Sequence, residues 1–287
     1  MEPFKNLFNV EQIKLMATHF HRVWPEFDRK GFCKLAGENL EQNELKQRSD
    51  QIMRGLEVYL PTSFPEAAKI MVDSLHPDDD VDISNLTMDE QGIRGWACMP
   101  MCHYVGIHGI EDFELGMSTQ WELTKRSSSE FGIRFFILAD QPRALATFAG
   151  WALDDNYHVR RLVSEGSRPR LPWAMQLQEL IRDPSPILPL LEKLRDDPSE
   201  YVHRSVANNL NDIAKDHPDT VAGIAEKWLK GATPERQKLV RHACRTLIKQ
   251  GHQRTLLALG YGKPEVTNAR RAHTHYSCRH NGTAPAI

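Results

Sequence analysis

The chain has 287 residues, 40% of them hydrophobic and 26% charged, and a formal net charge of −2 at pH 7, which is typical of a globular protein and excludes a disordered or fibrous chain. Its longest apolar stretches, such as 133–139, are too short to span a bilayer, and its N-terminus lacks the charged-then-apolar pattern of a secretory signal. We therefore expect a cytoplasmic protein without a membrane partner.

The first part of the chain is predicted to be helical. Apolar residues recur at spacings of three and four over 10–24 and 41–59, which is the pattern of amphipathic helices. Three prolines that follow these stretches mark helix starts or ends. We predict an N-terminal helical region over residues 1–77.

A linker is predicted after this region. The acidic run 78–82 contains four aspartates, and closely spaced like charges repel one another and favour solvation. Residues 92–108 are rich in glycine and aromatic residues and are not assigned to a regular element. We predict a linker and irregular segment over residues 78–110.

From residue 111 the chain becomes repetitive, with helix pairs joined by short acidic or proline-containing turns. The second helix of each pair carries an equivalent valine, at Val159, Val202 and Val240, and these valines are 43 and 38 residues apart. This spacing is close to the period of roughly 40–47 residues in HEAT repeats, and strand-type alternation is nearly absent. We predict an all-α superhelical solenoid of HEAT-like helical repeats, with its catalytic core over 111–262.

Basic residues follow the same period. In a HEAT solenoid the second helices line a concave surface. Here they begin with the pairs Arg160/Arg161, His203/Arg204 and Arg241/His242. Such a stripe suits the phosphates of a DNA duplex, but the arginines could equally pair with aspartates of the turns between helices. Both interpretations stay open.

The charge distribution favours a polyanionic partner for the second part of the chain. Residues 1–120 hold 11 Lys and Arg against 20 Asp and Glu, a net charge of −9, whereas residues 121–287 hold 25 against 18, a net charge of +7. Because charge fluctuates along any chain, this asymmetry alone is weak support.

An unusual loop is predicted within 159–174. A glycine, two prolines and Trp173 fall within eight residues, which no regular helix accommodates, so the chain leaves the helix as a rigid loop. Its arginines suit phosphate contacts, and Trp173 suits stacking on a base. A tryptophan in such a turn is also a common packing plug, and the periodicity does not separate the two.

Three ordered motifs in this region carry a resemblance to a known family. They are 129–134 (SEFGIR), 160–173 (RRLVSEGSRPRLPW) and 208–212 (NNLND). With them the chain resembles the HEAT-like-repeat alkylpurine DNA glycosylases, specifically the AlkC branch, from Phe4 to about Lys263. The match covers nearly the whole chain up to that point.

The resemblance implies a DNA repair glycosylase that hydrolyses the N-glycosidic bond of cationic alkylated purines, chiefly 3-methyladenine, in double-stranded DNA. It implies Glu130 and Asp212 as catalytic carboxylates near the sugar and Trp173 as a catalytic aromatic residue against the lesion. Together with the basic stripe and the loop, it leads to a set of candidate DNA-binding residues: Phe131, Arg160, Arg161, Arg168, Arg170 and Arg204.

The residue chemistry agrees with these implied roles. A purine alkylated at N3 or N7 already carries positive charge, so it leaves without protonation by a general acid. Ionised carboxylates such as Glu130 and Asp212 can stabilise the oxocarbenium-like sugar and supply water. The face of Trp173 attracts a cation by about 0.5–2 kcal/mol.

Other interpretations remain at this point. Glu130 could cap a helix after Ser127, and Asp212 could be a solvated residue on a helix surface. The chain as a whole could be a non-catalytic HEAT-like protein that binds damaged or branched DNA, or a protein-binding scaffold. Since no lysine stands out as a Schiff-base nucleophile, we expect a monofunctional enzyme, without a cofactor, acting as a monomer.

Cysteine usage and the C-terminal residues complete the sequence picture. Five cysteines without a regular framework are expected to be reduced thiols, and although Cys98 and Cys102 precede His103, no second close pair completes a metal site. Residues 263–287 are basic and predicted to be disordered, in place of the immunoglobulin-like domain of many AlkC-branch members. This tail could replace lost DNA contacts or be an altered reading frame of that domain, and its His and Cys residues could bind a metal opportunistically.

Overall fold

The computed structural model describes residues 4–79 and 87–262, and these residues form an all-α fold. One isolated parallel bridge, between Leu75 and Ile93, is the sole β-type pairing in these ranges. The elements are η1 (Phe4–Leu7), α1 (Val10–Val23), α2 (Arg29–Gly37), η2 (Leu40–Gln42), α3 (Leu45–Tyr59), α4 (Phe64–Asp73), η4 (Gly95–Ala97), α5 (Cys98–His108), α6 (Phe113–Lys125), α7 (Ile133–Ala139), α8 (Gln141–Trp151), α9 (Tyr157–Gly166), α10 (Gln178–Arg182), η5 (Ser185–Ile187), α11 (Leu188–Leu194), α12 (Glu200–Ile213), α13 (Pro218–Trp228), α14 (Pro234–Ala243), α15 (Arg245–Lys249) and α16 (Gln253–Ala258).

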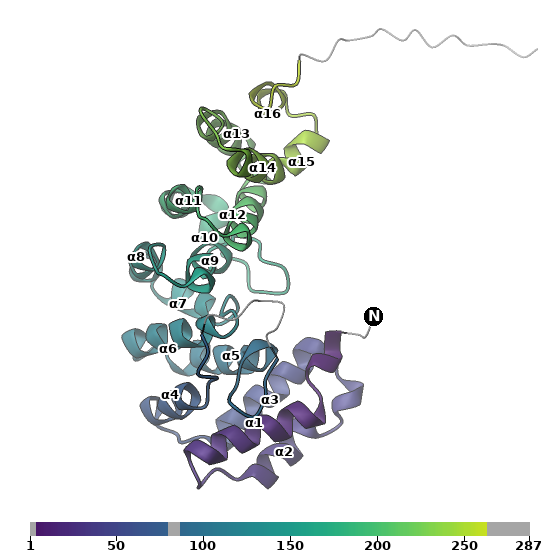
Figure 1. Ribbon diagram of the computed structural model, residues 1–287, viewed down its shortest axis with the longest axis vertical. Helices are drawn as coiled ribbons and strands as arrows, with labels where there is room; N and C mark the ends of the chain where they lie inside the picture. Colours follow the sequence, from purple (N-terminus) through teal and green to yellow (C-terminus); the bar gives the residue numbers. More distant parts are fainter. Residues whose placement is uncertain (1–3, 80–86, 263–287) are drawn as a thin grey trace, which may run out of the picture.

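The helices stack along one long axis, from a bundle of α1 to α4 at one end to α16 at the other (Figure 1). In the second part of the chain, α8, α11 and α13 lie along one side of the stack, and α9, α12 and α14 lie along the other (Figure 1). Helix α12 packs directly against both α9 and α14. This arrangement confirms the predicted all-α fold and its pairs of repeated helices.

Each repeat begins with local capping and is fixed by its buried face. The Asn156 side chain accepts a hydrogen bond from the backbone N–H of His158 at the start of α9, which satisfies one of the unpaired N–H groups of the helix. The three equivalent valines, Val159, Val202 and Val240, are at most 2% exposed. The valine period therefore records equivalent positions in the core between the repeats.

The structure corrects the expectation of an irregular segment over 78–110. Residues 98–108 form helix α5, which packs against α3, α6 and α7. Most of α5 is buried, including Cys98, Met101, Cys102 and Val105. A helix enclosed by neighbours is apolar on most of its faces and shows no amphipathic period, which is why the sequence pattern did not reveal it.

Several expectations lie wholly or partly outside the described residues. Positions 80–82 of the acidic run do so, as does the tail 263–287 with its candidate metal-binding residues. Among the described residues, no helix is long and apolar enough to cross a membrane.

The four cysteines of the described ranges form no disulfide with one another. Three of the four are buried, namely Cys98, Cys102 and Cys244. Burial raises the pKa of the Cys102 thiol to about 12, and its sulfur lies 3.1 Å from Oγ of Ser129. Among the described residues, no group of three His, Cys, Asp or Glu side chains is arranged to hold a metal ion.

Candidate functional site

The loop after α9 is held in place by a buried arginine. Arg134, on α7, is 0% exposed and donates hydrogen bonds to the backbone carbonyls of Gly166, Arg168 and Met175, at 3.0, 2.9 and 2.7 Å. Burial, together with the nearby charge of Arg168, lowers the pKa of Arg134 to about 10. Because both ends of the loop are bonded to one side chain, the loop has a defined position beside α7, as its proline content predicted.

Trp173 lies near the tip of this loop in a strained conformation. Its φ of 65° falls in the left-handed region, which is unfavourable for a bulky residue, and such strain is common at functional sites. Trp173 is 69% exposed, and its carbonyl accepts a hydrogen bond from Nζ of Lys46 at 3.3 Å. The interpretation of Trp173 as a packing plug is therefore wrong.

A second turn, between α6 and α7, presents Glu130 and Phe131. This turn lies against α5 so closely that a Cβ added to Gly132 would be 2.1 Å from the carbonyl oxygen of Cys102, a contact that only glycine avoids. Ser129 Oγ also donates to the carbonyl of Gln120 at 3.0 Å. The close packing of Gly132 against α5 thus fixes the position of Glu130, two residues before it.

The loop and the turn face the same cleft, which has a volume of about 590 Å³. The cleft brings together five of the predicted site residues: Glu130, Phe131, Arg161, Arg168 and Trp173. Further walls come from Trp96, Glu165 and Tyr201. Sequence reasoning did not select any of these three residues.

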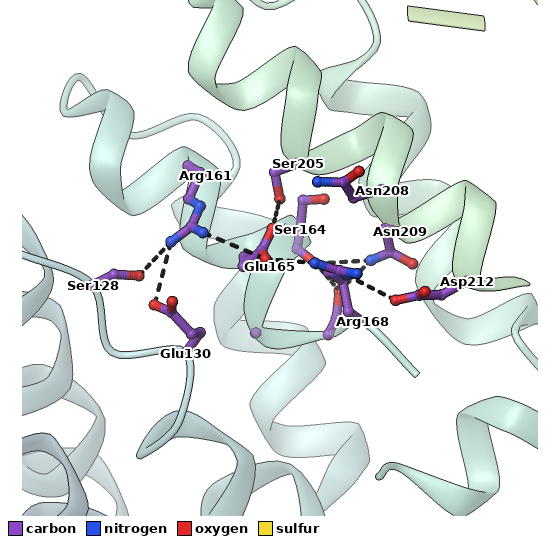
Figure 2. Close-up of polar contacts among 12 residues, drawn as sticks. Ser128, Glu130, Arg161, Ser164, Glu165, Arg168, Ser205, Asn208, Asn209 and Asp212 are labelled. Atoms are coloured by element: carbon purple, nitrogen blue, oxygen red, sulfur yellow. Dashed lines mark hydrogen bonds and ion pairs between the residues drawn. The ribbon is translucent and has the colours of Figure 1, made fainter. Parts of the chain in front are cut away.

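Arg161 connects the two sides of the cleft (Figure 2). Its Nη1 donates to Oγ of Ser128 at 2.6 Å and to Oε2 of Glu130 at 3.2 Å, and its Nη2 lies 3.4 Å from Oε1 of Glu165. The guanidinium also lies 4.8 Å from the centre of the Tyr201 ring. Burial alone lowers the pKa of Arg161, but the carboxylates of Glu130 and Glu165 outweigh burial and raise it.

A buried chain of charges continues from Glu165 away from the cleft (Figure 2). Glu165 accepts hydrogen bonds from Nη1 of Arg168 at 2.7 Å and from Oγ of Ser205 at 2.6 Å. Burial by itself raises the pKa of Glu165, but the charges of Arg161 and Arg168 outweigh it and hold the pKa below the ordinary value. Glu165 is therefore an ionised carboxylate between two arginines.

Asp212, on α12, stands at the end of this chain. Its Oδ2 accepts from Nε of Arg168 at 2.8 Å, and its Oδ1 accepts from Nζ of Lys215 at 3.0 Å. Asp212 is 2% exposed, so its interpretation as a solvated residue on a helix surface is wrong. Asp212 does not line the cleft. Arg168 does, and its guanidinium lies against the Asp212 carboxylate.

The other predicted DNA-binding arginines lie outside the cleft. Arg160 makes a two-point hydrogen bond to Asp197, at 2.6 and 3.1 Å, and also donates to backbone carbonyls of the turn before α9. Arg170 is paired in the same two-point manner with Asp216 near the surface. Arg204 is exposed on α12 and has no hydrogen bond or ion pair with any described residue. Their contacts with DNA remain predictions.

Sequence reasoning gave no role to two residues that organise this site, Glu165 and Arg134. Both fall inside the recognised motifs, at 160–173 and 129–134, which was the available signal. Their roles depend on partners that are 32 to 41 residues away in sequence, such as Gly166 and Met175 for Arg134 and Ser205 for Glu165. Spacing within one helix does not reveal such pairs.

The fold and the cleft define an all-α repeat protein with a carboxylate and arginine network beside an exposed tryptophan. No protein-family model matches the chain. The uncharacterized protein YhaZ of Bacillus subtilis (strain 168) is 36% identical over 262 residues, which are 91% of this chain and 69% of that protein. A solved structure of Pseudomonas fluorescens alkylpurine DNA glycosylase AlkC, bound to DNA containing an abasic site analog, is 37% identical with a TM-score of 0.79, and the match covers 90% of this chain and 68% of that one. The chain belongs to the AlkC family of alkylpurine DNA glycosylases.

Proposed function

We propose that the chain is a monofunctional DNA glycosylase that excises cationic alkylated purines, chiefly 3-methyladenine, from double-stranded DNA. The observation that carries this proposal is the placement of Glu130 and Trp173 on the walls of one cleft, in a chain 37% identical to an AlkC glycosylase. The cleft offers a carboxylate for the sugar and an aromatic face for the positively charged base.

In the proposed reaction, the bond between the sugar C1′ and the purine nitrogen breaks, and its electron pair neutralises the positive charge of the base. The sugar becomes an oxocarbenium ion, which the negative charge of Glu130 stabilises. Glu130 also orients a water molecule, which attacks C1′ and gives up its proton to the carboxylate. Oε1 of Glu130 accepts no hydrogen bond from the described residues and is available for this water, while Oε2 is oriented by Arg161.

Asp212 is proposed as the second carboxylate. With Arg168 against it, Asp212 does not reach the cleft. We infer that Arg168 turns from Asp212 toward a DNA phosphate on binding, since a guanidinium exchanges one oxyanion for another with little loss of hydrogen bonding. Asp212 would then face the sugar together with Glu130.

DNA binding is proposed to involve the cleft arginines, Arg161 and Arg168, and the exposed Arg204 on α12. These guanidinium groups would contact phosphates without regard to sequence. Phe131 and Trp173 would contact the damaged nucleotide from the cleft wall. Because the lesion is recognised by its charge, a neutral adenine or guanine is not expected to be excised.

The test is release of free bases from duplex DNA treated with a methylating agent, with 3-methyladenine and 7-methylguanine separated by chromatography. We expect faster release of 3-methyladenine, with DNA strands that stay intact until alkali is added. Strand cleavage without alkali would contradict a monofunctional enzyme. Tight, salt-sensitive DNA binding without any release would favour the alternative of a non-catalytic protein that binds damaged or branched DNA.

A further inference from the structure

A second, smaller chamber adjoins the cleft at Trp173. Its volume is about 270 Å³. Met99, Phe131 and Trp173 line both the chamber and the cleft, so these three side chains form the partition between them. The remaining walls of the chamber come from α3, α5, α7 and the loop after α9: Lys46, Ser49, Asp50, His103, Phe135, Ala174 and Met175.

The chamber is suited to a flat, uncharged ring. Its walls are largely aromatic or sulfur-containing, and the rings of His103 and Phe135 lie 5.5 Å apart with an interplanar angle of 35°. Aromatic and methionine side chains are favourable partners for a heterocycle. The volume is slightly below the usual range for sites of drug-sized ligands, which is about 300–1,000 Å³, and fits a small ligand such as one bicyclic base.

Polar groups on the wall of the chamber provide hydrogen bonds for such a ring. Ser49 is 1% exposed, and its Oγ has no hydrogen-bond partner in the described residues. A buried hydroxyl without a partner is unfavourable, so a ligand that reaches this oxygen from the chamber gains a hydrogen bond there. Beside it, Nδ1 of His103 lies 3.3 Å from Oδ1 of Asp50, which leaves Nε2 of the imidazole for a further contact.

We propose that this chamber binds the free purine base that excision releases. The proposal rests on the glycosylase function proposed above and adds a product site to it. Before cleavage the base is a cation and faces the carboxylate of Glu130 in the cleft. After cleavage it is neutral. Asp50 is the one carboxylate among the described residues that line the chamber, and it is already paired with an imidazole, so the chamber is a better environment for a neutral heterocycle than for a cation.

The partition explains how the base reaches the chamber. Trp173 forms part of both cavities, so a base stacked on it in the cleft is one side chain away from the chamber. Trp173 itself is 69% exposed at the tip of the loop, while Arg134 and Arg168 fix the rest of the loop. Occupancy of the chamber by the base would slow the next turnover, so the free base acts as a product inhibitor.

The test is calorimetric titration of the whole protein with free 3-methyladenine, and with adenine as a second probe. Wild type is compared with His103→Ala and Ser49→Ala. The matched control is His108→Ala, because His108 is also on α5 and is also paired with a carboxylate of α3, Glu57 at 2.9 Å, yet it does not line the chamber. Both histidine variants therefore lose one histidine–carboxylate pair between α5 and α3.

We expect wild type and His108→Ala to bind the base with the same affinity, and His103→Ala to bind it about tenfold more weakly. Ser49→Ala is expected to weaken binding about fivefold. Inhibition of excision by added base should weaken in the same order. If one histidine variant does not fold, which circular dichroism detects, Ser49→Ala against wild type still decides the question.

Two outcomes would overturn the proposal. One is excision by a wild-type protein that does not bind the free base, which would leave the proposed glycosylase function intact. The other is weaker binding of methylated duplex DNA by His103→Ala with unchanged binding of the free base, which would assign the chamber to the nucleotide in DNA. Binding of the base by a protein that excises nothing would instead contradict the glycosylase function.

Discussion

Arg168 and Asp212 form a buried ion pair, with Nε of Arg168 2.8 Å from Oδ2 of Asp212 and side-chain exposures of 9% and 2%. Arg168 lies on the loop after α9 and Asp212 lies on α12, so the pair joins the loop to the next repeat (Figure 2). The same guanidinium also bonds Glu165. The loop that carries Trp173 is therefore fixed to α12 as well as to α7.

This pair predicts a clear loss of stability when Arg168 is replaced. Arg168→Met removes a hydrogen-bond partner from two buried carboxylates, Glu165 and Asp212. We therefore expect the free energy of unfolding to fall by about 3 kcal/mol. Arg170→Met is the matched control, because Arg170 is on the same loop but its pair with Asp216 is about 30% exposed, and we expect a change below about 1 kcal/mol. Urea denaturation of both variants measures this difference, and equal losses would contradict the buried pair.

Arg160 and Arg204 separate the two interpretations of the basic stripe. Arg160 is bonded to Asp197 within the repeats, so Arg160→Ala should lower the free energy of unfolding by about 3 kcal/mol with little effect on DNA binding. Arg204 has no partner among the described residues, so Arg204→Ala should leave stability unchanged and weaken DNA binding. The slope of log affinity against log salt should fall by about 1 for Arg204→Ala alone. A reduced slope in the Arg160 variant would show that the ion pair opens to DNA.

Arg134 is predicted to act on excision through the loop. Arg134→Met removes the hydrogen bonds to three loop carbonyls, so Trp173 and Arg168 lose their fixed positions and excision should fall at least tenfold. Arg48→Met is the matched control, because buried Arg48 likewise bonds three backbone carbonyls, of Lys5, Phe8 and Asn43, but none in the loop.

Single-turnover excision and urea denaturation of these two variants separate structure from activity. Both should be destabilised to a similar degree, since each leaves buried carbonyls without donors. Only Arg134→Met should lose excision when both proteins are assayed well below their unfolding transitions. Equal losses of excision would mean that Arg134 contributes stability alone.

Glu165 predicts a pH dependence of stability. Its pKa in the folded protein is held below its ordinary value of 4.5 by Arg161 and Arg168, despite burial. Its ionised form therefore stabilises the fold fully above about pH 4.5, and this contribution is lost as the pH falls through the lowered folded pKa. The difference in unfolding free energy between wild type and Glu165→Gln should be constant from pH 8 to about 5.5 and shrink below about 4.5. If this difference in unfolding free energy instead grows below about pH 4.5, Glu165 does not have a lowered pKa in the folded protein.

The sequence predicted those features that depend on periodicity. The valines at Val159, Val202 and Val240 identified the helix pairs, because equivalent positions of a repeat are buried in the same way. Helix α5 was missed for the opposite reason, since it packs against α3, α6 and α7 and its buried residues are not confined to one face. Apolar periodicity is informative only for helices with one solvated side.

The candidate site was predictable only in part. The motifs contained Glu130, Phe131, Arg161, Arg168 and Trp173, and the fold brings these five together in one cleft. Their mutual pairing was not predictable, because it joins helices of different repeats. Arg160 and Arg161 are adjacent in sequence, yet an aspartate of the next repeat holds Arg160, whereas Arg161 faces the cleft.

The most direct test of the central claim is single-turnover release of 3-methyladenine by Glu130→Gln, with duplex DNA binding measured on the same preparation. Glutamine keeps the size of the side chain and an oxygen for Arg161 but removes the negative charge that the oxocarbenium ion requires. We predict that the excision rate falls at least about a hundredfold while DNA affinity stays within a few-fold of wild type. Excision at the wild-type rate would contradict the assignment of Glu130 as the catalytic carboxylate.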